Sequence, residues 1–337
     1  MNAPLVEITG LRITIPTDDG PVDLVDGVDL RIEHGEVVGV AGESGSGKTL
    51  TALALMGFLP NRARVTSGVV SYDGKSVFDL SAKALRAMRG KEIGMIFQDP
   101  MTSLHPMLSI ERLMTEHMRV HLKLSTSEAR ERALGLLDEV RLPDPERVMV
   151  SFAHQFSGGM RQRIAIAIAL ACEPRLLIAD EPTTALDVTV QAGILHLLDR
   201  LRKDSGLSVL FISHDLGVVN AIADRLNIFY AGRVVERGSA AQLLKAPRHP
   251  YTRSLLDSLP GGDGARSRLR LIPGETPAPG NRPSGCAFHP RCQWAEPACS
   301  GALPELLHVE DDRAVACPVD PFGPDSPSVR SRVPGGC

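Results

Sequence analysis

A glycine-rich segment with one lysine could bind the phosphates of a nucleotide. Its residues, which fit the pattern G-x-x-x-x-G-K-[ST], are Gly42, Glu43, Ser44, Gly45, Ser46, Gly47, Lys48 and Thr49. Glycines let backbone N–H groups converge on phosphate oxygens, Lys48 can reach the β- and γ-phosphates, and the Thr49 hydroxyl can bind Mg²⁺. An apolar run at residues 37–41 precedes the segment and a helix-like run follows it. The segment therefore predicts a nucleoside triphosphate site.

Two adjacent acids could supply the rest of a hydrolytic site. Asp180 and Glu181 directly follow the apolar residues 176–179, as at the end of a buried strand. Behind a phosphate-binding loop, Asp180 is expected to interact with Mg²⁺ and Glu181 to polarise the attacking water. Alone, the pattern would also fit a strand that ends in two solvated carboxylates.

Four further short motifs share an order along the chain with these two. They are Ile96-Phe97-Gln98-Asp99, Phe156-Ser157-Gly158-Gly159-Met160-Arg161-Gln162-Arg163, Ala185-Leu186-Asp187 and Ile212-Ser213-His214-Asp215. Alone, Ser157 and the two glycines would be a helix N-cap. Together, the six motifs resemble those of ABC ATPases: the four above resemble the Q-loop, the signature, the D-loop and the switch histidine. Met160 stands where many members of the family have Gln.

This resemblance implies that two nucleotide-binding domains pack head to tail with two ATP molecules between them. Ser157, Gly158 and Gly159 would then contact the γ-phosphate bound to the partner, through a hydroxyl and a helix N-terminus. Asp187 would contact the opposite subunit. Hydrolysis would require both subunits.

The resemblance also implies roles around the chain's own nucleotide. Glu181 would be the general base for water, His214 would contact the γ-phosphate, and Gln98 would link Mg²⁺ and water to a helical insert. Thr49, Gln98 and Asp180 are the candidate Mg²⁺ ligands. The family usually stacks an aromatic residue on adenine, but the matching position here is Ile15, which can pack on the ring without supplying a π face.

The elements that must position these residues read as an α/β fold. Short apolar runs alternate with amphipathic stretches before residue 250, which indicates a largely parallel sheet buried on both faces. Between residues 99 and 156 helical signals dominate; Ser125 and Glu128 there form a capping-box pattern. The fold class that we expect is a P-loop ABC nucleotide-binding domain with a RecA-like parallel core, an antiparallel β subdomain and a helical subdomain.

Proline and cysteine mark a second region. Of the 25 prolines, 15 follow Ala246, as do five of the six cysteines. We therefore predict an ATPase domain at residues 1–250 and a small Cys/Pro-rich extension at 251–337, the last dozen or so residues of which are disordered.

Composition disfavours several classes of function. The net charge of -3 gives no bulk attraction for nucleic acid, so no nucleic-acid partner is expected. The longest apolar run, residues 164–172, is far shorter than the roughly 20 residues that a membrane-spanning helix needs. The start of the chain lacks the pattern of a signal peptide, so we expect a protein that is not secreted.

Within the family, three segments resemble the D-type ATPase of bacterial oligopeptide and dipeptide importers. They are residues 98–104, residues 157–163 and His249-Pro250-Tyr251-Thr252. The resemblance implies a heterodimer with an F-type ATPase, two transmembrane permeases and an extracytoplasmic substrate-binding protein. It places the chain peripherally on the cytoplasmic face of the bacterial inner membrane. Importers of nickel complexes or glutathione, and non-transport ABC ATPases of DNA repair or translation, are the alternatives.

Four cysteines of the extension form a candidate metal site: Cys286, Cys292, Cys299 and Cys317. No C-x-x-C pair is present, which disfavours common zinc patterns, and a cytoplasmic setting disfavours disulfides. Residues 286–292 resemble the importer extension in which such cysteines hold a [4Fe-4S] cluster in some members, and four thiolates suit that cluster. Zinc, or reduced thiols without metal, remain the other interpretations.

Overall fold

The computed structural model describes residues 3–60, 62–99, 103–184, 186–259, 272–310 and 312–323. The chain divides into two compact units, which we treat separately. The helical unit comprises residues 1–5, 32–37 and 75–212, and the P-loop unit comprises residues 6–31, 38–74 and 213–337. The C-terminal end that we expect to be disordered lies outside the described residues.

The helical unit contains three parallel strands. β6 (Ile93–Ile96) pairs with β7 (Leu176–Asp180), and β7 pairs with β8 (Ser208–Ser213). Every residue of β7 and β8 is buried, as expected for parallel strands that are covered on both faces. The unit also contains the short strand β5 (Lys75–Ser76) and the helices α2 (Ala82–Met88) and α8 (Val188–Ser205).

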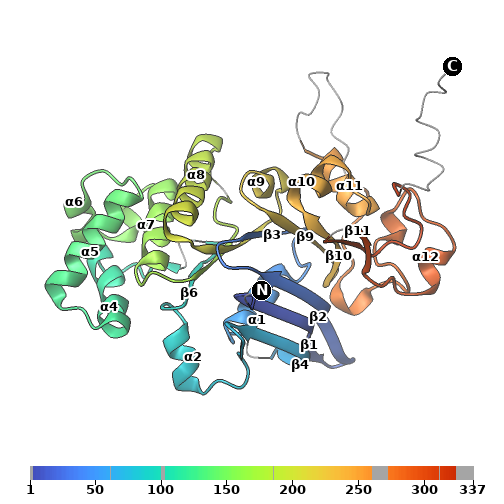
Figure 1. Cartoon of the computed structure of the whole chain (residues 1–337), viewed down its shortest axis with the longest axis horizontal. Coiled ribbons are helices and arrows are strands. Elements are labelled where there is room, and N and C mark those ends of the chain that lie inside the picture. The colour runs from blue at the N-terminus through green and yellow to red at the C-terminus, as the bar shows by residue number, and fades with distance from the viewer. Residues whose placement is uncertain are drawn as a thin grey trace. The chain divides into compact units, whose positions relative to one another are not determined.

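A group of helices follows β6 and gives the unit its name (Figure 1). Its members are α4 (Ile110–Leu122), α5 (Thr126–Glu139), α6 (Pro145–Val150), the 3₁₀ turn η1 (Ala153–Gln155) and α7 (Gly158–Leu170). Side-chain caps begin these α-helices, and the capping box predicted for Ser125 and Glu128 is confirmed. The apolar face of α5 packs inside the group, with Ala129, Ala133 and Leu137 buried.

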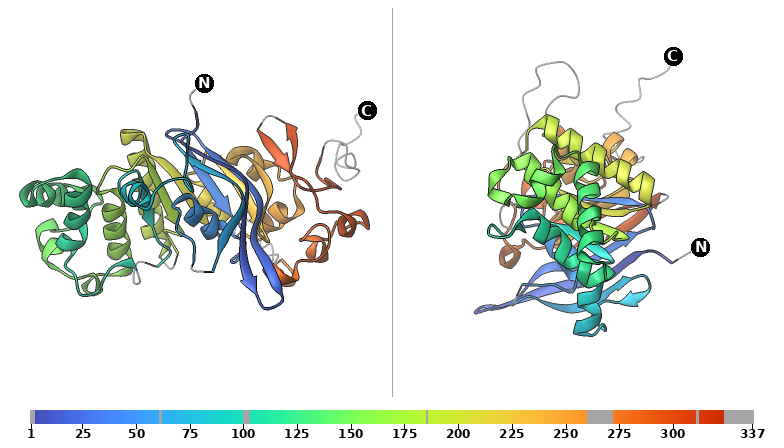
Figure 2. Two further views of the ribbon diagram at one scale, coloured as in Figure 1. Left: turned by 90° about the horizontal axis from the view of Figure 1, so that it is seen from below. Right: turned by 90° about the vertical axis from the view of Figure 1, so that its left-hand side faces the viewer.

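The P-loop unit begins with an antiparallel sheet. β1 (Val6–Thr17) and β2 (Gly20–Ile32) form the long hairpin seen in Figure 2, and β1 pairs with β4 (Arg64–Tyr72). Residues of β1 alternate between buried and exposed positions over much of its length, so one face of this sheet lies on the core.

A mixed sheet forms the rest of this unit. β3 (Val37–Ala41) runs parallel to β9 (Arg225–Tyr230), and β9 runs antiparallel to β10 (Arg233–Ser239). The C-terminal extension continues the sheet, because β12 (Arg313–Val315) pairs with β10, and β11 (Leu307–Glu310) pairs with β12. The helices and 3₁₀ turns of the unit are α1 (Lys48–Leu55), α9 (Leu216–Asn220), α10 (Ala240–Lys245), α11 (Pro250–Asp257), η2 (Pro279–Asn281), η3 (His289–Arg291) and α12 (Ala298–Gly301).

A buried ion pair joins the extension to β10. The Arg313 guanidinium lies 2.7 Å from the Glu236 carboxylate, and both side chains are almost wholly buried. Glu236 also accepts hydrogen bonds from the backbone N–H groups of Arg248 and His249. Because a buried charge is tolerated only when it is paired and hydrogen-bonded, removing either partner would strongly destabilise this junction.

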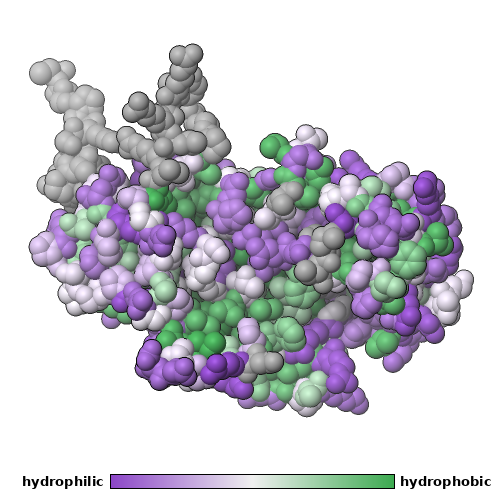
Figure 3. Space-filling model, turned by 180° about the vertical axis from the view of Figure 1, so that it is seen from behind, coloured by the Kyte–Doolittle hydropathy of each residue, from purple (hydrophilic) through white to green (hydrophobic). Residues whose placement is uncertain are grey.

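On the face drawn in Figure 3, apolar residues gather in patches between polar ones. Among the parts of the chain that the structure describes, no helix has the length and apolar character needed to cross a bilayer.

Candidate functional site

The glycine-rich segment leaves β3 and enters α1, as the sequence predicts. Gly42 has a φ of +150°, and a Cβ atom there would clash with the carbonyl oxygen of Phe229. Gly47, with a φ of +97°, is the N-cap of α1. These two positions need glycine because of backbone conformation and close approach. The segment therefore has the strand, loop and helix N-terminus of a phosphate-binding loop.

Lys48 closes the loop on itself. Its ammonium donates hydrogen bonds to the carbonyl oxygens of Gly42, at 2.7 Å, and Glu43, at 2.8 Å. The side chain is 5% exposed. Since both acceptors belong to the loop, the lysine holds the turn in a compact form with its charge beside the loop backbone.

The other predicted residues of the loop differ in exposure. Ser44 and Gly45 are exposed, Ser46 is buried, and Thr49 is partly exposed in the first turn of α1. The carbonyl oxygen of Ser46 accepts a hydrogen bond from the backbone N–H of Gly232, at 3.1 Å. This bond ties the loop to the turn between β9 and β10.

Ile15 and His214 also belong to the P-loop unit. Ile15 is partly exposed on β1, and His214 is exposed directly after β8. Beside His214, Asp215 caps α9 by accepting from the backbone N–H groups of Gly217 and Val218. The start of α9 therefore fixes the backbone that follows the histidine.

Glu181 and Gln98 meet in the helical unit. The Gln98 amide donates to the Glu181 carboxylate at 3.3 Å, and the Thr184 hydroxyl donates to the same oxygen at 2.9 Å. Asp180, the last residue of β7, is buried with 3% exposure. Glu181 has a φ of +48°, and its N–H donates to the carbonyl oxygen of Ile212 at 2.9 Å. The turn after β7 thus separates a buried acid from a partly exposed one.

The two predicted partner-facing motifs lie at helix N-termini of the helical unit. Ser157 caps α7, where its hydroxyl accepts from the Met160 N–H, and Asp187 caps α8 by accepting from the Val190 N–H at 2.9 Å. Gly158 is exposed, whereas a Cβ atom on Gly159 would lie 2.8 Å from Cγ1 of Val190. The first turns of α7 and α8 are therefore packed together.

Glu43 is held by residues that sequence reasoning did not connect to the loop. Arg291 donates to both carboxylate oxygens, at 2.7 and 3.0 Å, and the Thr276 hydroxyl donates to one of them. The Glu43 N–H donates to the Tyr251 hydroxyl at 2.8 Å. Burial alone would raise the pKa of Glu43, but the hydrogen bonds from Arg291 and Thr276 outweigh burial and lower it. No local signal marks these partners, because Arg291 is 248 positions away in sequence.

The four cysteines of the extension line one small pocket of the P-loop unit. The Cys286 N–H donates to the carbonyl oxygen of Cys299 at 2.8 Å, which draws two of their chain segments together. Among the described residues, however, no three His, Cys, Asp or Glu side chains are arranged to hold a metal ion. The predicted metal site is therefore not confirmed.

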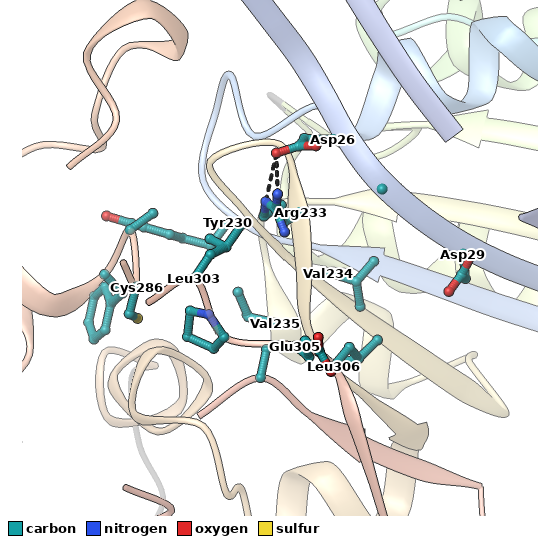
Figure 4. Close-up of a pocket in the computed structure, with 15 residues that line it drawn as sticks. Asp26, Asp29, Tyr230, Arg233, Val234, Val235, Cys286, Leu303, Glu305 and Leu306 are labelled. Carbon is teal, nitrogen blue, oxygen red and sulfur yellow. Dashed lines mark hydrogen bonds and ion pairs between the residues drawn. The ribbon is translucent and has the colours of Figure 1, made fainter. Parts of the chain in front are cut away.

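A larger pocket, of about 380 Å³, lies between the extension and β9–β10 (Figure 4). Cys286 and Leu303 line it from the extension, and Tyr230 and Arg233 line it from the β9–β10 hairpin. Arg233 pairs with Asp26 on its wall. The described part of the extension thus forms part of the wall of this pocket and packs on the rest of the unit.

Comparison with known proteins covers almost the whole chain. The family model described as ABC transporter matches residues 25–184, and the model described as oligopeptide/dipeptide transporter, C-terminal region, matches residues 235–299. A protein of Brucella abortus (strain 2308), provisionally named a peptide import ATP-binding protein, is 46% identical over 94% of this chain and 95% of its own length. One from Brucella melitensis with the same kind of name is 46% identical over 93% of this chain and 96% of its own.

Solved structures of ABC proteins are also similar to this chain. A dimeric ATP-binding cassette in a post-hydrolysis state, bound to ADP and Pi, is 30% identical with a TM-score of 0.63, covering 70% of this chain and 98% of that one. The cbiO1 protein of Clostridium perfringens, part of the ABC transporter complex cbiONQ, is 28% identical with a TM-score of 0.62, covering 72% and 92%.

Proposed function

Because this chain belongs to the ABC transporter family, we propose that it is the ATP-binding and ATP-hydrolysing subunit of a transporter that imports peptides. The observation that carries the proposal is the identity of 46% over nearly the full length with proteins named for peptide import. The match of residues 235–299 to the oligopeptide/dipeptide transporter region supports the same substrate class.

The residues of the motifs have separate roles in hydrolysis. The backbone N–H groups of the phosphate-binding loop (P-loop, residues 42–49) and Lys48 bind the phosphates, and Glu181 accepts the proton of the attacking water. Thr49, Asp180 and Gln98 would hold Mg²⁺, which neutralises charge on the phosphates. The hydrogen bonds from Gln98 and Thr184 support this role of Glu181, because they orient its carboxylate before nucleotide arrives.

Other residues would act at the nucleotide and between subunits. Ile15 packs on adenine and His214 contacts the γ-phosphate. Ser157, Gly158 and Gly159 contact the nucleotide of a partner ATPase, and Asp187 contacts that partner itself. The position of Ser157 and the two glycines at the N-terminus of α7, where the helix dipole favours an anion, supports this role.

The assembly that we propose contains a second, F-type ATPase, two permeases and an extracytoplasmic binding protein. The chain would be bound to the permeases at the cytoplasmic face of the bacterial inner membrane. Its role there is to convert nucleotide-driven closure into a change of access in the permeases.

Reconstitution of the assembled transporter in proteoliposomes tests this function. We expect ATP-dependent uptake of a radiolabelled dipeptide or tripeptide, and loss of that uptake when Lys48→Ala replaces the wild-type chain. Uptake of a nickel complex, or of glutathione with its γ-glutamyl bond, without uptake of α-linked dipeptides and tripeptides would overturn the substrate class while leaving the importer intact.

We also propose that Cys286, Cys292, Cys299 and Cys317 bind a [4Fe-4S] cluster. The number of these cysteines and the pocket that they share support this proposal. The described side chains are not arranged as metal ligands. The proposed steps of ATP hydrolysis do not involve the cluster. Anaerobically purified protein should contain iron and acid-labile sulfide and absorb visible light. Zinc without sulfide, or neither metal, would overturn this ligand.

A further inference from the structure

Arg291 of the extension binds Glu43 of the P-loop through an ion pair. Its two terminal nitrogens bind the two carboxylate oxygens of Glu43, and its Nε donates to the carbonyl oxygen of Pro273 at 2.8 Å. The Arg291 side chain is 7% exposed and that of Glu43 is 25% exposed. A bidentate pair of this kind fixes orientation as well as charge.

Aromatic residues hold the arginine in place. The Arg291 guanidinium lies 5.8 Å from the ring centre of Tyr230 and 5.9 Å from that of Phe288. One terminal nitrogen also donates to the Tyr230 hydroxyl at 3.2 Å. All three nitrogens of the guanidinium donate hydrogen bonds, so Arg291 cannot move away from Glu43 without breaking several contacts.

The backbone of Glu43 is held as well. Its N–H donates to Tyr251, whose ring is buried, and its carbonyl oxygen accepts from Lys48. The side chain, the N–H and the carbonyl group of Glu43 are therefore all fixed. Two of these three attachments come from residues at or beyond position 251.

We propose that Arg291 is a positioning residue for nucleotide binding, which neutralises Glu43 and holds it so that the P-loop can accept triphosphate. The inference rests on the proposed ATPase function and adds a role for the extension in it. It assigns that role to one ion pair between the extension and the loop.

The negative charge of Glu43 determines whether loss of Arg291 weakens or strengthens triphosphate binding. The carboxylate is close enough to Lys48 for the lysine to stabilise its ionised form. Without Arg291, the carboxylate would compete with phosphate for Lys48 and would repel the triphosphate. Removing the negative charge as well should abolish both effects.

The test is binding of a fluorescent ATP analogue with Mg²⁺ to the full-length chain. We expect Arg291→Ala to raise Kd about tenfold, and Glu43→Gln added to Arg291→Ala to restore it to within about threefold of wild type. Arg291→Lys, which keeps charge but loses the bidentate geometry, should fall between wild type and Arg291→Ala. Arg253→Ala is the control, since it removes an arginine from an ion pair with Asp257 elsewhere in the same unit.

The outcomes separate the inference from the proposed function. A wild-type chain that does not bind the analogue would refute the ATPase function itself. Normal binding by wild type and Arg291→Ala alike would refute only the inference. Weakened binding without rescue by Glu43→Gln would also refute it, because loss of structure alone gives no rescue. If Arg291→Ala does not fold, Arg291→Gln, which removes the charge but keeps a longer side chain, is compared with Glu43→Gln/Arg291→Gln in the same way.

Discussion

At the scale of single residues, the hydrolytic role that we propose for Glu181 depends on how this residue is held. Its φ of +48° lies in the left-handed region, which costs a non-glycine residue about 1 kcal/mol or more. The hydrogen bond from its N–H to Ile212 and those from Gln98 and Thr184 to its carboxylate oppose that cost. At this turn Asp180 is buried, whereas Glu181 is partly exposed.

Replacing Glu181 by Gln should separate binding from turnover. The amide keeps the size of the side chain but cannot accept a proton from water, so we expect ATPase activity of the assembled complex to fall by about 10²- to 10⁴-fold. The Kd for MgATP should change by less than about threefold. Steady-state ATPase assays and equilibrium binding measure the two quantities.

Thr184→Ala provides the comparison for this prediction. It removes one hydrogen bond to Glu181 and keeps the carboxylate, so turnover should fall far less. Undiminished activity of the Glu181→Gln complex would remove Glu181 from the role of base.

At the scale of secondary structure, local patterns predicted much of what is observed. The capping box of Ser125 and Glu128 needs only residues of one helix turn, and it is confirmed. The predicted α/β fold class is likewise confirmed. The sheet is more mixed than the apolar runs suggested, because β10, β11 and β12 are antiparallel. β9 is buried almost throughout although its neighbour β10 is antiparallel, so the continuous burial typical of parallel strands does not fix the direction of the next strand here.

The start of α7 should be sensitive to one added methyl group. A Cβ atom on Gly159 would lie 2.8 Å from Cγ1 of Val190, a β-branched residue with little rotamer freedom. Gly159→Ala should therefore destabilise the chain by about 1–3 kcal/mol, because α7 and α8 must shift. Urea denaturation of the purified chain measures the effect.

Two variants check the cause. A Cβ atom on Gly158 would lie 3.8 Å from its nearest neighbour, so Gly158→Ala should be neutral or slightly stabilising. Adding Val190→Ala to Gly159→Ala should recover part of the loss. Equal effects of Gly158→Ala and Gly159→Ala on the free energy of unfolding would show that helix propensity, and not the contact with Val190, determines the effect.

At the scale of the whole molecule, the extension belongs to the P-loop unit. Phe288 packs against Tyr230 and Tyr251, with ring centres 5.3 Å from each, and it is 1% exposed. The sequence predicted a small Cys/Pro-rich extension, but not where it would pack. Contacts such as Arg291 with Glu43 join distant segments, and no local spacing encodes them.

Phe288→Ala should therefore destabilise the entire P-loop unit. Loss of a buried phenyl ring costs about 3–5 kcal/mol, and here the cavity would lie between the extension and β9. We expect a lower urea midpoint and faster limited proteolysis of the described residues before position 74 as well as of the extension. Phe58→Ala, at a side chain that is 58% exposed in the same unit, should change stability by no more than about 0.5 kcal/mol. If proteolysis of Phe288→Ala accelerated only beyond residue 272, the extension would unfold independently. Its packing on β9 would then not stabilise the rest of the P-loop unit.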